Sequence, residues 1–337
     1  MSTQNLPVQL RVSIGTAISL DLIEGKMDVT PATAYLMTFT EGKCLANCNF
    51  CPQAQESKSN TNLLSRVSWP AFPTFVVVAA LNNAIKKGNI KRVCIQVLNV
   101  PNVFLHVDSL VREIKKNDPG ICVSVSCQPL NSENILLLKK AGVDRIGIAL
   151  DAASEAIFRH IKGVEGGGIY NWHQELGLLE EALLIFGQGK VSTHLIAGLG
   201  ETEQEIVCLI QWCVDKGILP ALFAFTPIKG TPLEKHSPPN IESYRRLQLA
   251  RYMLVQGITC FKHLTFNTEG QIVLFGVDTT ILDAIVNSGL PFQTSGCPNC
   301  NRPFYNEKPS GPLYNYPKNL NQKELDEVKR QLNIRPF

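Results

Sequence analysis

The sequence has no long apolar run, no apolar leader and no strong excess of charge. Its longest apolar run, around residues 75–81, is much shorter than the roughly 18 residues that span a bilayer. The first nine residues are polar and lack the apolar stretch of a secretory signal peptide. The net charge of +3, from 32 basic and 29 acidic residues, indicates no nucleic-acid-binding face. We therefore expect a cytoplasmic protein that binds neither membrane nor nucleic acid.

Phosphate-binding loops are also missing. The sequence contains no P-loop, and its one glycine-rich segment comprises Gly163, Gly166, Gly167 and Gly168. This segment follows a predicted helix, whereas the dinucleotide-binding fingerprint follows a strand. The competing fold, a doubly wound open sheet, therefore lacks its usual sequence signature.

One pattern recurs along the chain: a helix ends at a glycine, a short turn follows, and then comes an apolar strand. Such strands are predicted at residues 34–39, 92–97, 121–127, 145–150, 191–196 and 221–225. Continuously apolar strands that alternate with helices indicate a parallel sheet with right-handed connections. At least six such units, with two more considered towards the C-terminus, predict an α/β fold. The predicted fold is a parallel (β/α) barrel, complete or nearly complete.

The predicted barrel has an appendage at each end. Residues 1–30 form an N-terminal extension, and residues 31–290 form the barrel, with a hairpin near residues 263–275. Residues 291–337 form a tail rich in Pro, Asn and Tyr, which should be irregular apart from a short helix near residues 322–332. This tail carries a C-x2-C pair.

Eleven cysteines are present, and in a cytosolic chain they indicate metal or redox chemistry. Cys44, Cys48 and Cys51 follow the first predicted strand with the spacing C-x3-C-x2-C. Three thiolates on one loop can hold three irons of a 4Fe–4S cluster and leave the fourth iron without a protein ligand. The alternative is a zinc site, although zinc sites usually pair C-x2-C units.

With Asn47, Asn49 and Phe50 beside these cysteines, the segment resembles the signature of the radical S-adenosylmethionine (SAM) superfamily. The resemblance implies a radical SAM barrel. It also implies that the amino and carboxylate groups of SAM chelate the open iron, with Phe50 among the SAM-binding residues. An electron from the cluster then breaks a C–S bond of SAM and yields a 5′-deoxyadenosyl radical.

Further segments resemble the biotin synthase-like branch of this superfamily. Asp151 ends the fourth predicted strand, where an aspartate binds the SAM ribose in that branch. The alternative is a helix N-cap, because residues 152–161 look helical. Arg159 and His173 lie where relatives place a contact to the SAM carboxylate, and both also fit the solvated surface of a helix.

The segment after the fifth strand matches the branch pattern G-x-I-x-G-x-x-E at Ile196, Gly198 and Glu201, with His194 in place of the first glycine. The resemblance implies that this segment supports the adenine of SAM. The alternative is a tight turn in which Glu201 stabilises the start of the following helix.

A second cysteine set is expected at the barrel mouth. Cys297 and Cys300 can clamp one metal, while Cys94 lies on the second predicted strand and Cys127 ends the third. In biotin synthase, cysteines at comparable places on these two strands hold an auxiliary cluster. The third cysteine of that set falls on the fifth strand, where this chain has Ser192 and Thr193, so the resemblance is incomplete. We expect the C-terminal pair to replace it, which makes these four residues the ligands of a second 4Fe–4S cluster. The alternatives are an ordinary core cysteine at Cys94 and a zinc ion at the C-terminal pair.

Residues 13–17, 33–38 and 301–309 resemble biotin synthase-like proteins that act as a two-component lipoyl synthase. This resemblance implies a radical SAM sulfurtransferase that inserts sulfur into a protein-bound octanoyl chain, with the auxiliary cluster as sulfur donor. The implied partners are an octanoylated carrier protein, a second radical SAM protein, and an electron donor such as ferredoxin or flavodoxin. The alternatives are another enzyme of the branch (biotin synthase, a mutase or a maturase) with structural C-terminal cysteines, and a zinc-binding scaffold without activity.

Overall fold

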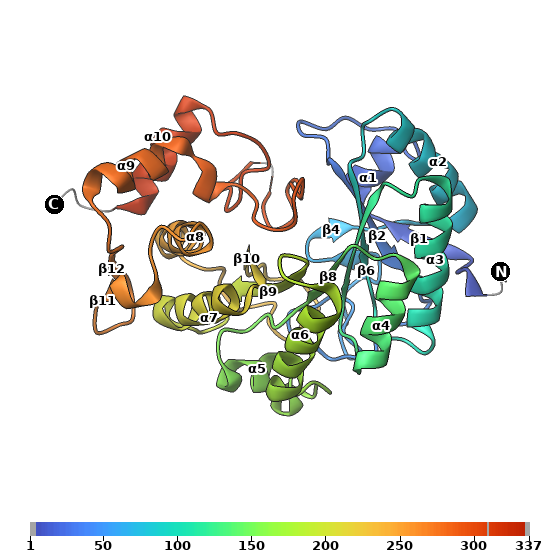
Figure 1. Cartoon of the computed structure of the whole chain (residues 1–337), viewed down its shortest axis with the longest axis horizontal. Coiled ribbons are helices and arrows are strands. Elements are labelled where there is room, and N and C mark those ends of the chain that lie inside the picture. Colours follow the sequence, from blue (N-terminus) through green and yellow to red (C-terminus); the bar gives the residue numbers. More distant parts are fainter. Residues whose placement is uncertain (1–4, 309, 334–337) are drawn as a thin grey trace.

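The computed structural model describes residues 5–308 and 310–333. The ends of the predicted extension and tail, and Pro309, lie outside the described residues. An eight-stranded curved sheet forms the centre of the molecule (Figure 1). Six neighbouring strands run parallel: β2 (Thr33–Thr38), β6 (Arg92–Gln96), β7 (Cys122–Cys127), β8 (Arg145–Ile148), β9 (Val191–Ala197) and β10 (Leu219–Ala224). Each coincides with a predicted strand, so the α/β fold with a mostly parallel sheet is confirmed.

Two antiparallel strands extend the sheet beyond β2. β1 (Gln9–Val12) pairs with β2, and β5 (Ala71–Pro73) pairs with β1. β1 belongs to the predicted N-terminal extension, so the structure places part of that segment in the central sheet. At the opposite edge, β10 pairs within the described residues with β9 alone. In residues 5–308 and 310–333 the parallel part therefore comprises six strands, and the two additional C-terminal units considered from the sequence contribute no strand to this sheet.

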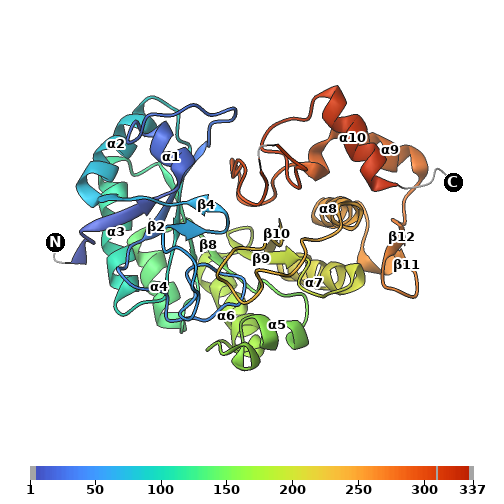
Figure 2. The ribbon, with the colours of Figure 1, turned by 180° about the vertical axis from the view of Figure 1, so that it is seen from behind.

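Helices connect the parallel strands and cover the outer face of the sheet (Figures 1 and 2). They are α2 (Thr74–Lys86), α3 (Val103–Asn117), α4 (Ser132–Ala141), α5 (Glu155–Ile161), the short 3-10 helix η2 (Val164–Gly166), α6 (Trp172–Phe186) and α7 (Glu203–Lys216). In α3 the buried positions are Val103, Phe104, Val107, Leu110, Val111 and Ile114. This spacing of three and four residues forms one apolar stripe that packs on the sheet. No helix in the described part of the chain is long and apolar enough to cross a membrane.

The remaining elements lie before β6 or after β10 in the chain. They are α1 (Ile14–Ser19), β3 (Leu63–Leu64), β4 (Val67–Ser68), α8 (Ile241–Val255), η3 (Phe261–His263), β11 (Thr265–Phe266), β12 (Ile272–Leu274), α9 (Thr279–Ser288), η4 (Leu290–Phe292) and α10 (Gln322–Leu332). β11 and β12 form the predicted hairpin. The last helix also forms as predicted.

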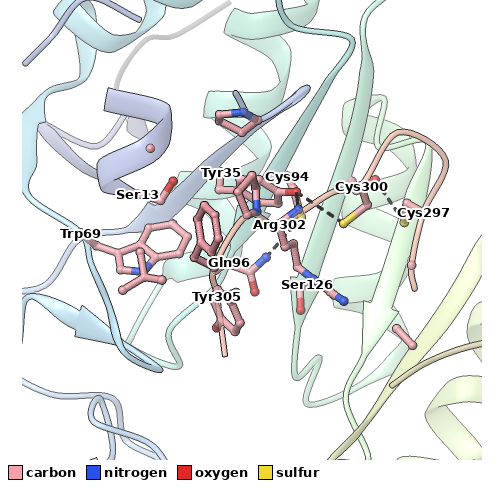
Figure 3. A pocket seen from close by; sticks show the side chains of 18 of the residues that line it. Ser13, Tyr35, Trp69, Cys94, Gln96, Ser126, Cys297, Cys300, Arg302 and Tyr305 are labelled. Atoms are coloured by element: carbon pink, nitrogen blue, oxygen red, sulfur yellow. Dashed lines mark hydrogen bonds between the residues drawn. The ribbon is translucent and has the colours of Figure 1, made fainter. Parts of the chain in front are cut away.

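Side chains in register on neighbouring parallel strands point to the same face of the sheet. Tyr35, Cys94, Ser124 and Arg145 form one such row across β2, β6, β7 and β8. A second row, two residues further along, comprises Gln96, Ser126, Gly147 and Ser192. Both rows line the interior of the curved sheet, and Figure 3 shows several of these residues around one pocket. Register alone therefore brings polar and sulfur-containing side chains into the barrel.

The C-terminal tail connects the first and last parallel strands. Ser295 Oγ accepts a hydrogen bond from the backbone N–H of Leu222 in β10, at 2.8 Å. Thr33 Oγ1, at the start of β2, donates to the carbonyl of Asn299 at 3.0 Å. Because side chain–backbone bonds replace a regular strand pairing here, the tail keeps its irregular path while it crosses the barrel.

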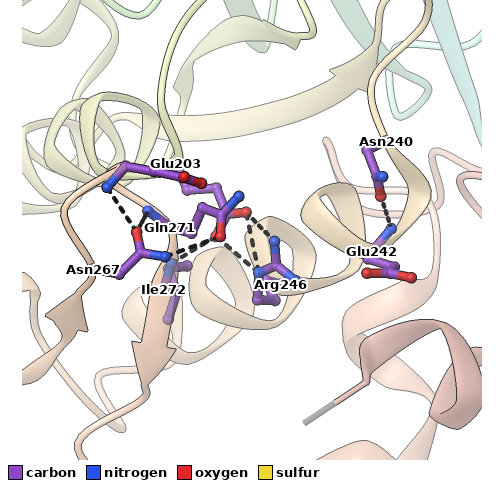
Figure 4. Close-up of polar contacts among 8 residues, drawn as sticks. Glu203, Asn240, Glu242, Arg246, Asn267, Gln271 and Ile272 are labelled. Atoms are coloured by element: carbon purple, nitrogen blue, oxygen red, sulfur yellow. Dashed lines mark hydrogen bonds and ion pairs between the residues drawn. The ribbon is translucent and has the colours of Figure 1, made fainter.

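A buried carboxylate holds the C-terminal helices together. Glu203 accepts hydrogen bonds from Arg246 Nε at 3.0 Å and from Arg246 Nη2 at 2.5 Å, and it also accepts from the backbone N–H of Ile272 at 2.8 Å (Figure 4). Glu203 begins α7, Arg246 lies in α8 and Ile272 begins β12. One charge-assisted network therefore links three elements that are distant in sequence.

We expect Glu203→Ala to destabilise the protein by about 3 kcal/mol, because it leaves a partly buried guanidinium and a buried N–H without their acceptor. The matched control is Glu180→Ala, which breaks an exposed ion pair with Lys216 and should cost less than about 1 kcal/mol. Urea denaturation of the two variants measures the difference. Equal losses would show that the network contributes no more than a surface ion pair.

Candidate active site

The three cysteines of the first cluster motif line one cavity of about 200 Å³, on the loop that follows β2. Their loop folds back on itself: the backbone N–H of Cys44 donates to the carbonyl of Gln53 at 2.9 Å, and that of Cys51 donates to the carbonyl of Cys48 at 2.9 Å. All three thiols are free of disulfides. The three cysteines of the motif therefore face the same cavity.

The loop is anchored to the end of α5 by the asparagine between the second and third cysteines. The backbone N–H of Asn49 donates to the carbonyl of Ile161 at 2.8 Å, and Asn49 Nδ2 donates to the carbonyl of His160 at 2.7 Å. The glycine-rich segment allows this close approach. A Cβ added at Gly166 would lie 2.1 Å from the carbonyl oxygen of His160. Backbone packing beside the cysteine loop therefore explains the glycines without a phosphate ligand.

The electrostatic surroundings of the thiols fit a cluster. Burial raises the pKa of Cys51 to about 12 and the pKa of Cys48 well above its ordinary value, so both favour the neutral thiol without a cation. The Lys162 ammonium acts in the opposite direction on the pKa of Cys48. Bound iron would supply the further positive charge that thiolates need. The backbone N–H of Asn99 already donates to Cys44 Sγ at 3.2 Å. These residues therefore fit a cluster held by Cys44, Cys48 and Cys51.

Asp151 lines the same cavity and forms a buried ion pair with Lys162, at 2.8 Å between Oδ2 and Nζ. Its φ of 65° is unusual for a residue other than glycine. The backbone is held there by bonds in both directions with β9, from Asp151 N to the His194 carbonyl and from Ile196 N to the Asp151 carbonyl. α5 begins at Glu155 with Ser154 at its N-cap, so Asp151 is not a helix cap. Lys162, which the sequence analysis missed, is the principal addition to this site.

The segment predicted to support adenine divides into two parts. Ile196 lines the cavity and belongs to the same apolar cluster as Phe50. Glu201 instead accepts hydrogen bonds from the backbone N–H groups of Gly198, at 2.6 Å, and Leu199, at 2.9 Å. Gly198 has φ of 101°, and an added Cβ would come 2.8 Å from a side-chain carbon of Pro239. Gly198 and Glu201 therefore shape the turn that presents Ile196, and neither lines the cavity.

Arg159 and His173 lie away from the cavity lining. Arg159 forms an ion pair with Glu165, and His173 Nε2 lies 3.4 Å from Glu155 Oε2. More than half of each side chain is exposed to solvent. The structure therefore places both on the surface.

A second cavity, of about 470 Å³, brings together Cys94, Cys297 and Cys300 (Figure 3). Gln96 Nε2 donates to Cys94 Sγ at 3.2 Å, and the Tyr35 hydroxyl lies 3.5 Å from Cys300 Sγ. These contacts come from the two inward rows of the sheet and from the tail. Three of the four predicted auxiliary ligands therefore share one cavity.

The fourth predicted auxiliary ligand, Cys127, lines the first cavity together with Cys44 and Cys48. Cys94 is in register with Ser124, and Cys127 lies three residues further along β7. Three residues of strand correspond to roughly 10 Å and also reverse the direction of the side chain. The structure therefore does not bring Cys127 to the other three cysteines.

The two cavities meet inside the barrel. Both are lined by Gln96, Ser126, His194, Phe223 and Tyr305. Burial lowers the pKa of His194 to about 4, so this imidazole is neutral near pH 7. The Phe223 and Tyr305 rings pack edge to face, with their centroids 6.0 Å apart. Sequence reasoning did not identify this shared wall, because its members come from four strands and the tail.

Three cysteines and an aspartate thus line one cavity at the carboxyl ends of the parallel strands. This arrangement agrees with the family comparison. The family model for the radical SAM superfamily matches residues 40–213, which is more than half of the chain. The protein belongs to the radical SAM superfamily. A bound 4Fe–4S cluster at Cys44, Cys48 and Cys51 would supply the electron that cleaves SAM in this superfamily.

Curated relatives include biotin synthases. That of Persephonella marina is 28% identical over 249 residues, covering 72% of this chain and 65% of the relative. That of a Hydrogenobaculum species is 30% identical over 204 residues, covering 58% and 56%. A lipoyl synthase of Histophilus somni is 29% identical over 113 residues, about a third of each chain. These matches confirm the resemblance to the biotin synthase-like branch, although the chain spans less than two thirds of the length of these relatives.

Solved structures show the same fold. A methylornithine synthase aligns with a TM-score of 0.50 and 13% identity, over 66% of this chain and 62% of that one. The FeFe-hydrogenase maturase of Carboxydothermus hydrogenoformans aligns with a TM-score of 0.52 and 13% identity, over 81% and 69%. At such low identity these neighbours support the architecture alone.

We expect Asp151→Ala to weaken SAM binding about tenfold or more, since charge-assisted hydrogen bonds to ribose hydroxyls are worth roughly 1.5–3 kcal/mol. The same change leaves Lys162 buried without its partner and should lower the melting temperature. Asp151→Ala/Lys162→Met removes both charges and should recover stability but not SAM affinity. Equilibrium dialysis and thermal melts measure the two effects. Recovery of both in the double variant would assign Asp151 a structural role only.

A buried carboxyl group on α6 lies near this ion pair. Glu175 is 3% exposed, and among the described residues its Oε2 atom has no hydrogen-bond partner. Burial raises the pKa of Glu175 from 4.5 to about 7, the Lys162 ammonium lowers it, and the Asp151 carboxylate raises it further. The folded protein therefore binds this proton more tightly than the unfolded chain.

Because the pKa of Glu175 is higher in the folded state, its ionisation should reduce stability as the pH rises from about 4.5 to about 7. Glu175→Gln, which stays neutral, should match the wild type at pH 4.5 and be more stable at pH 8. Glu180→Gln, on the exposed side of the same helix, is the control and should show no such trend. Melting temperatures across this range test the prediction, and parallel curves for wild type and Glu175→Gln would contradict it.

Proposed function

We propose that the protein is a sulfur-inserting radical SAM enzyme of the lipoyl synthase type, acting on a protein-bound octanoyl chain. The observation that carries the proposal is the meeting of two cysteine-lined cavities. Cys44, Cys48 and Cys51 line one, Cys94, Cys297 and Cys300 line the other, and five residues line both.

Sulfur insertion at an unactivated carbon has a strict geometric requirement. The group that removes the hydrogen atom and the group that donates sulfur must reach the same carbon. Reacting atoms must approach to roughly 3–3.5 Å for efficient reaction. Two separate cavities on opposite faces of the molecule could not meet this requirement, whereas cavities with a shared wall can.

The shared wall is suited to an alkyl chain. Its aromatic members are Phe223 and Tyr305, its histidine is neutral, and it contains no residue with a permanent charge. Next to it in the second row, Gly147 and Ser192 add little bulk. In this proposal an unbranched alkyl chain lies along these uncharged side chains and against the two aromatic rings. Exclusion of water would also protect a carbon radical from side reactions.

Each cavity has a defined role in this proposal. In the first, Asp151 and Lys162 orient SAM, while Phe50 and Ile196 contact its adenine. In the second, Cys94, Cys297 and Cys300 hold an auxiliary 4Fe–4S cluster that supplies the sulfur. Two observations support this ligand set: none of the three cysteines forms a disulfide, and all three line the second cavity. The partners in this proposal are an octanoylated carrier protein, a second radical SAM protein and a ferredoxin or flavodoxin, all in the cytoplasm.

Biotin synthesis is the second candidate, favoured by the predominance of biotin synthases among the relatives described above. The presence of Cys297 and Cys300 in the same cavity as Cys94 favours lipoyl synthesis, because this pair directly precedes residues 301–309, which carry part of the lipoyl synthase resemblance. Direct assays for sulfur gain by an octanoyl-lysyl peptide and for biotin formation discriminate between them.

We expect Cys297→Ala/Cys300→Ala to retain SAM cleavage but to lose sulfur insertion. Anaerobic reactions with a reductant are analysed for 5′-deoxyadenosine and for the mass of an octanoyl-lysyl peptide. Iron should fall from about eight to about four atoms per chain, the content of one 4Fe–4S cluster. The matched control is Cys122→Ala/Cys208→Ala, which removes two cysteines that line neither cavity and should change nothing.

The complementary variant, with Cys44, Cys48 and Cys51 all replaced by Ala, should form no 5′-deoxyadenosine. Sulfur gain that persists in Cys297→Ala/Cys300→Ala would refute the proposed sulfur donor. Zinc in place of the second set of irons would do the same.

A further inference from the structure

An arginine from the tail lies inside the cavity of the second cysteine set. The backbone N–H of Arg302 donates to the Tyr35 hydroxyl at 2.9 Å, and Arg302 Nη2 donates to the carbonyl of Ser295 at 2.7 Å. Its guanidinium carbon lies 3.9 Å from the centroid of the Phe223 ring, a cation–π contact. Figure 3 shows this side chain among Cys94, Gln96 and Ser126. Arg302 therefore reaches from the cysteine pair to the wall shared by the two cavities.

The backbone at Arg302 is held in an uncommon conformation, with φ of 30°. Such a conformation persists only where surrounding contacts stabilise it. Here the Tyr35 hydroxyl holds the Arg302 amide and also lies 3.5 Å from Cys300 Sγ. The same tyrosine therefore couples the position of the guanidinium to that of a cysteine.

The positive charge of Arg302 has no carboxylate partner within ion-pairing distance in the described part of the chain. A second guanidinium close by is in the same situation. Arg92 is 5% exposed and donates to the Pro298 carbonyl at 3.1 Å and to Ser124 Oγ at 2.8 Å, both uncharged acceptors.

Glu307 acts on Arg302 only from beyond ion-pairing distance, so a negative charge among the three cysteines would stabilise both arginines. Three thiolates on a cluster core supply it, because the assembly carries net negative charge. Arg302 is the better placed of the two to touch the core, because it lines the cavity of Cys94, Cys297 and Cys300, whereas Arg92 is not among the lining residues. Arginine is also suited to this task because its planar fork presents several donors in fixed directions.

We propose that Arg302 is a positioning residue of the auxiliary cluster: its guanidinium donates hydrogen bonds to sulfur atoms of the cluster and balances their negative charge. This inference rests on the proposed function, because it requires a cluster at Cys94, Cys297 and Cys300. A nearby cation stabilises the reduced, more negative state of a cluster over the oxidised state. Arg302 therefore raises the reduction potential of the auxiliary cluster. Its hydrogen bonds also hold in place the sulfides that would face the substrate.

The test isolates the auxiliary cluster in the full chain. In a background with Cys44, Cys48 and Cys51 replaced by Ala, about four irons per chain should remain. Redox titration followed by absorbance near 400 nm and by electron paramagnetic resonance measures the potential. Arg302→Met, which removes the charge but keeps much of the length, should shift the potential downwards. Arg302→Lys, which keeps the charge, should stay closer to the background value.

The matched control is Arg112→Met, which removes an exposed arginine paired with Asp108 on α3 and should leave the potential unchanged. An unchanged potential in Arg302→Met with four irons retained would overturn the inference while leaving the proposed function intact. If Arg302→Met loses iron, retention by Arg302→Lys supports the role of charge, and loss by both variants in a folded protein overturns it. A background without iron would overturn the proposed sulfur donor itself.

Discussion

The register of the parallel strands is the constraint on which the rest of this structure depends. Because side chains alternate between the two faces of a strand, and because neighbouring parallel strands are in register, a single choice of register selects every interior residue. Tyr35, Cys94 and Ser124 form one interior row, and Gln96 and Ser126 belong to the next. A shift of one residue in β6 alone would turn Cys94 onto the helix-covered face. The second cysteine set would then lose its barrel member.

The two sites use this scaffold differently. The first is built on loops at the carboxyl ends of the strands, where the backbone can fold around a ligand, and its charges are largely paired through Asp151 and Lys162. The second is built from interior side chains and a tail that crosses from β10 to β2, and among the described residues its arginines have no carboxylate within ion-pairing distance. The first site thus holds a cation and an anion in direct contact, whereas the arginines of the second are free to face an anionic cluster.

The tail has two consequences for function. It brings Cys297, Cys300, Arg302 and Tyr305 to the interior, and it links the first and last parallel strands through side chain–backbone hydrogen bonds. Tyr305 also lies on the wall between the cavities. A segment with little regular structure therefore forms much of the proposed reaction chamber, and the folded barrel provides the contacts that hold it.

Local sequence signals were sufficient for the parts of this protein that local chemistry controls. The spacing of Cys44, Cys48 and Cys51, the six strand–helix units and the last helix are all readable from neighbouring residues, since periodicity, turns and short ligand loops act over a few positions. Tertiary structure alone decided which distant side chains meet. Lys162 reaches Asp151, Arg302 enters the cysteine cavity, and Cys127 joins Cys44 and Cys48 instead of Cys94. The reason is physical: which side chains meet depends on the register between segments far apart in the chain, and that register is fixed only when the strands pair in the folded sheet.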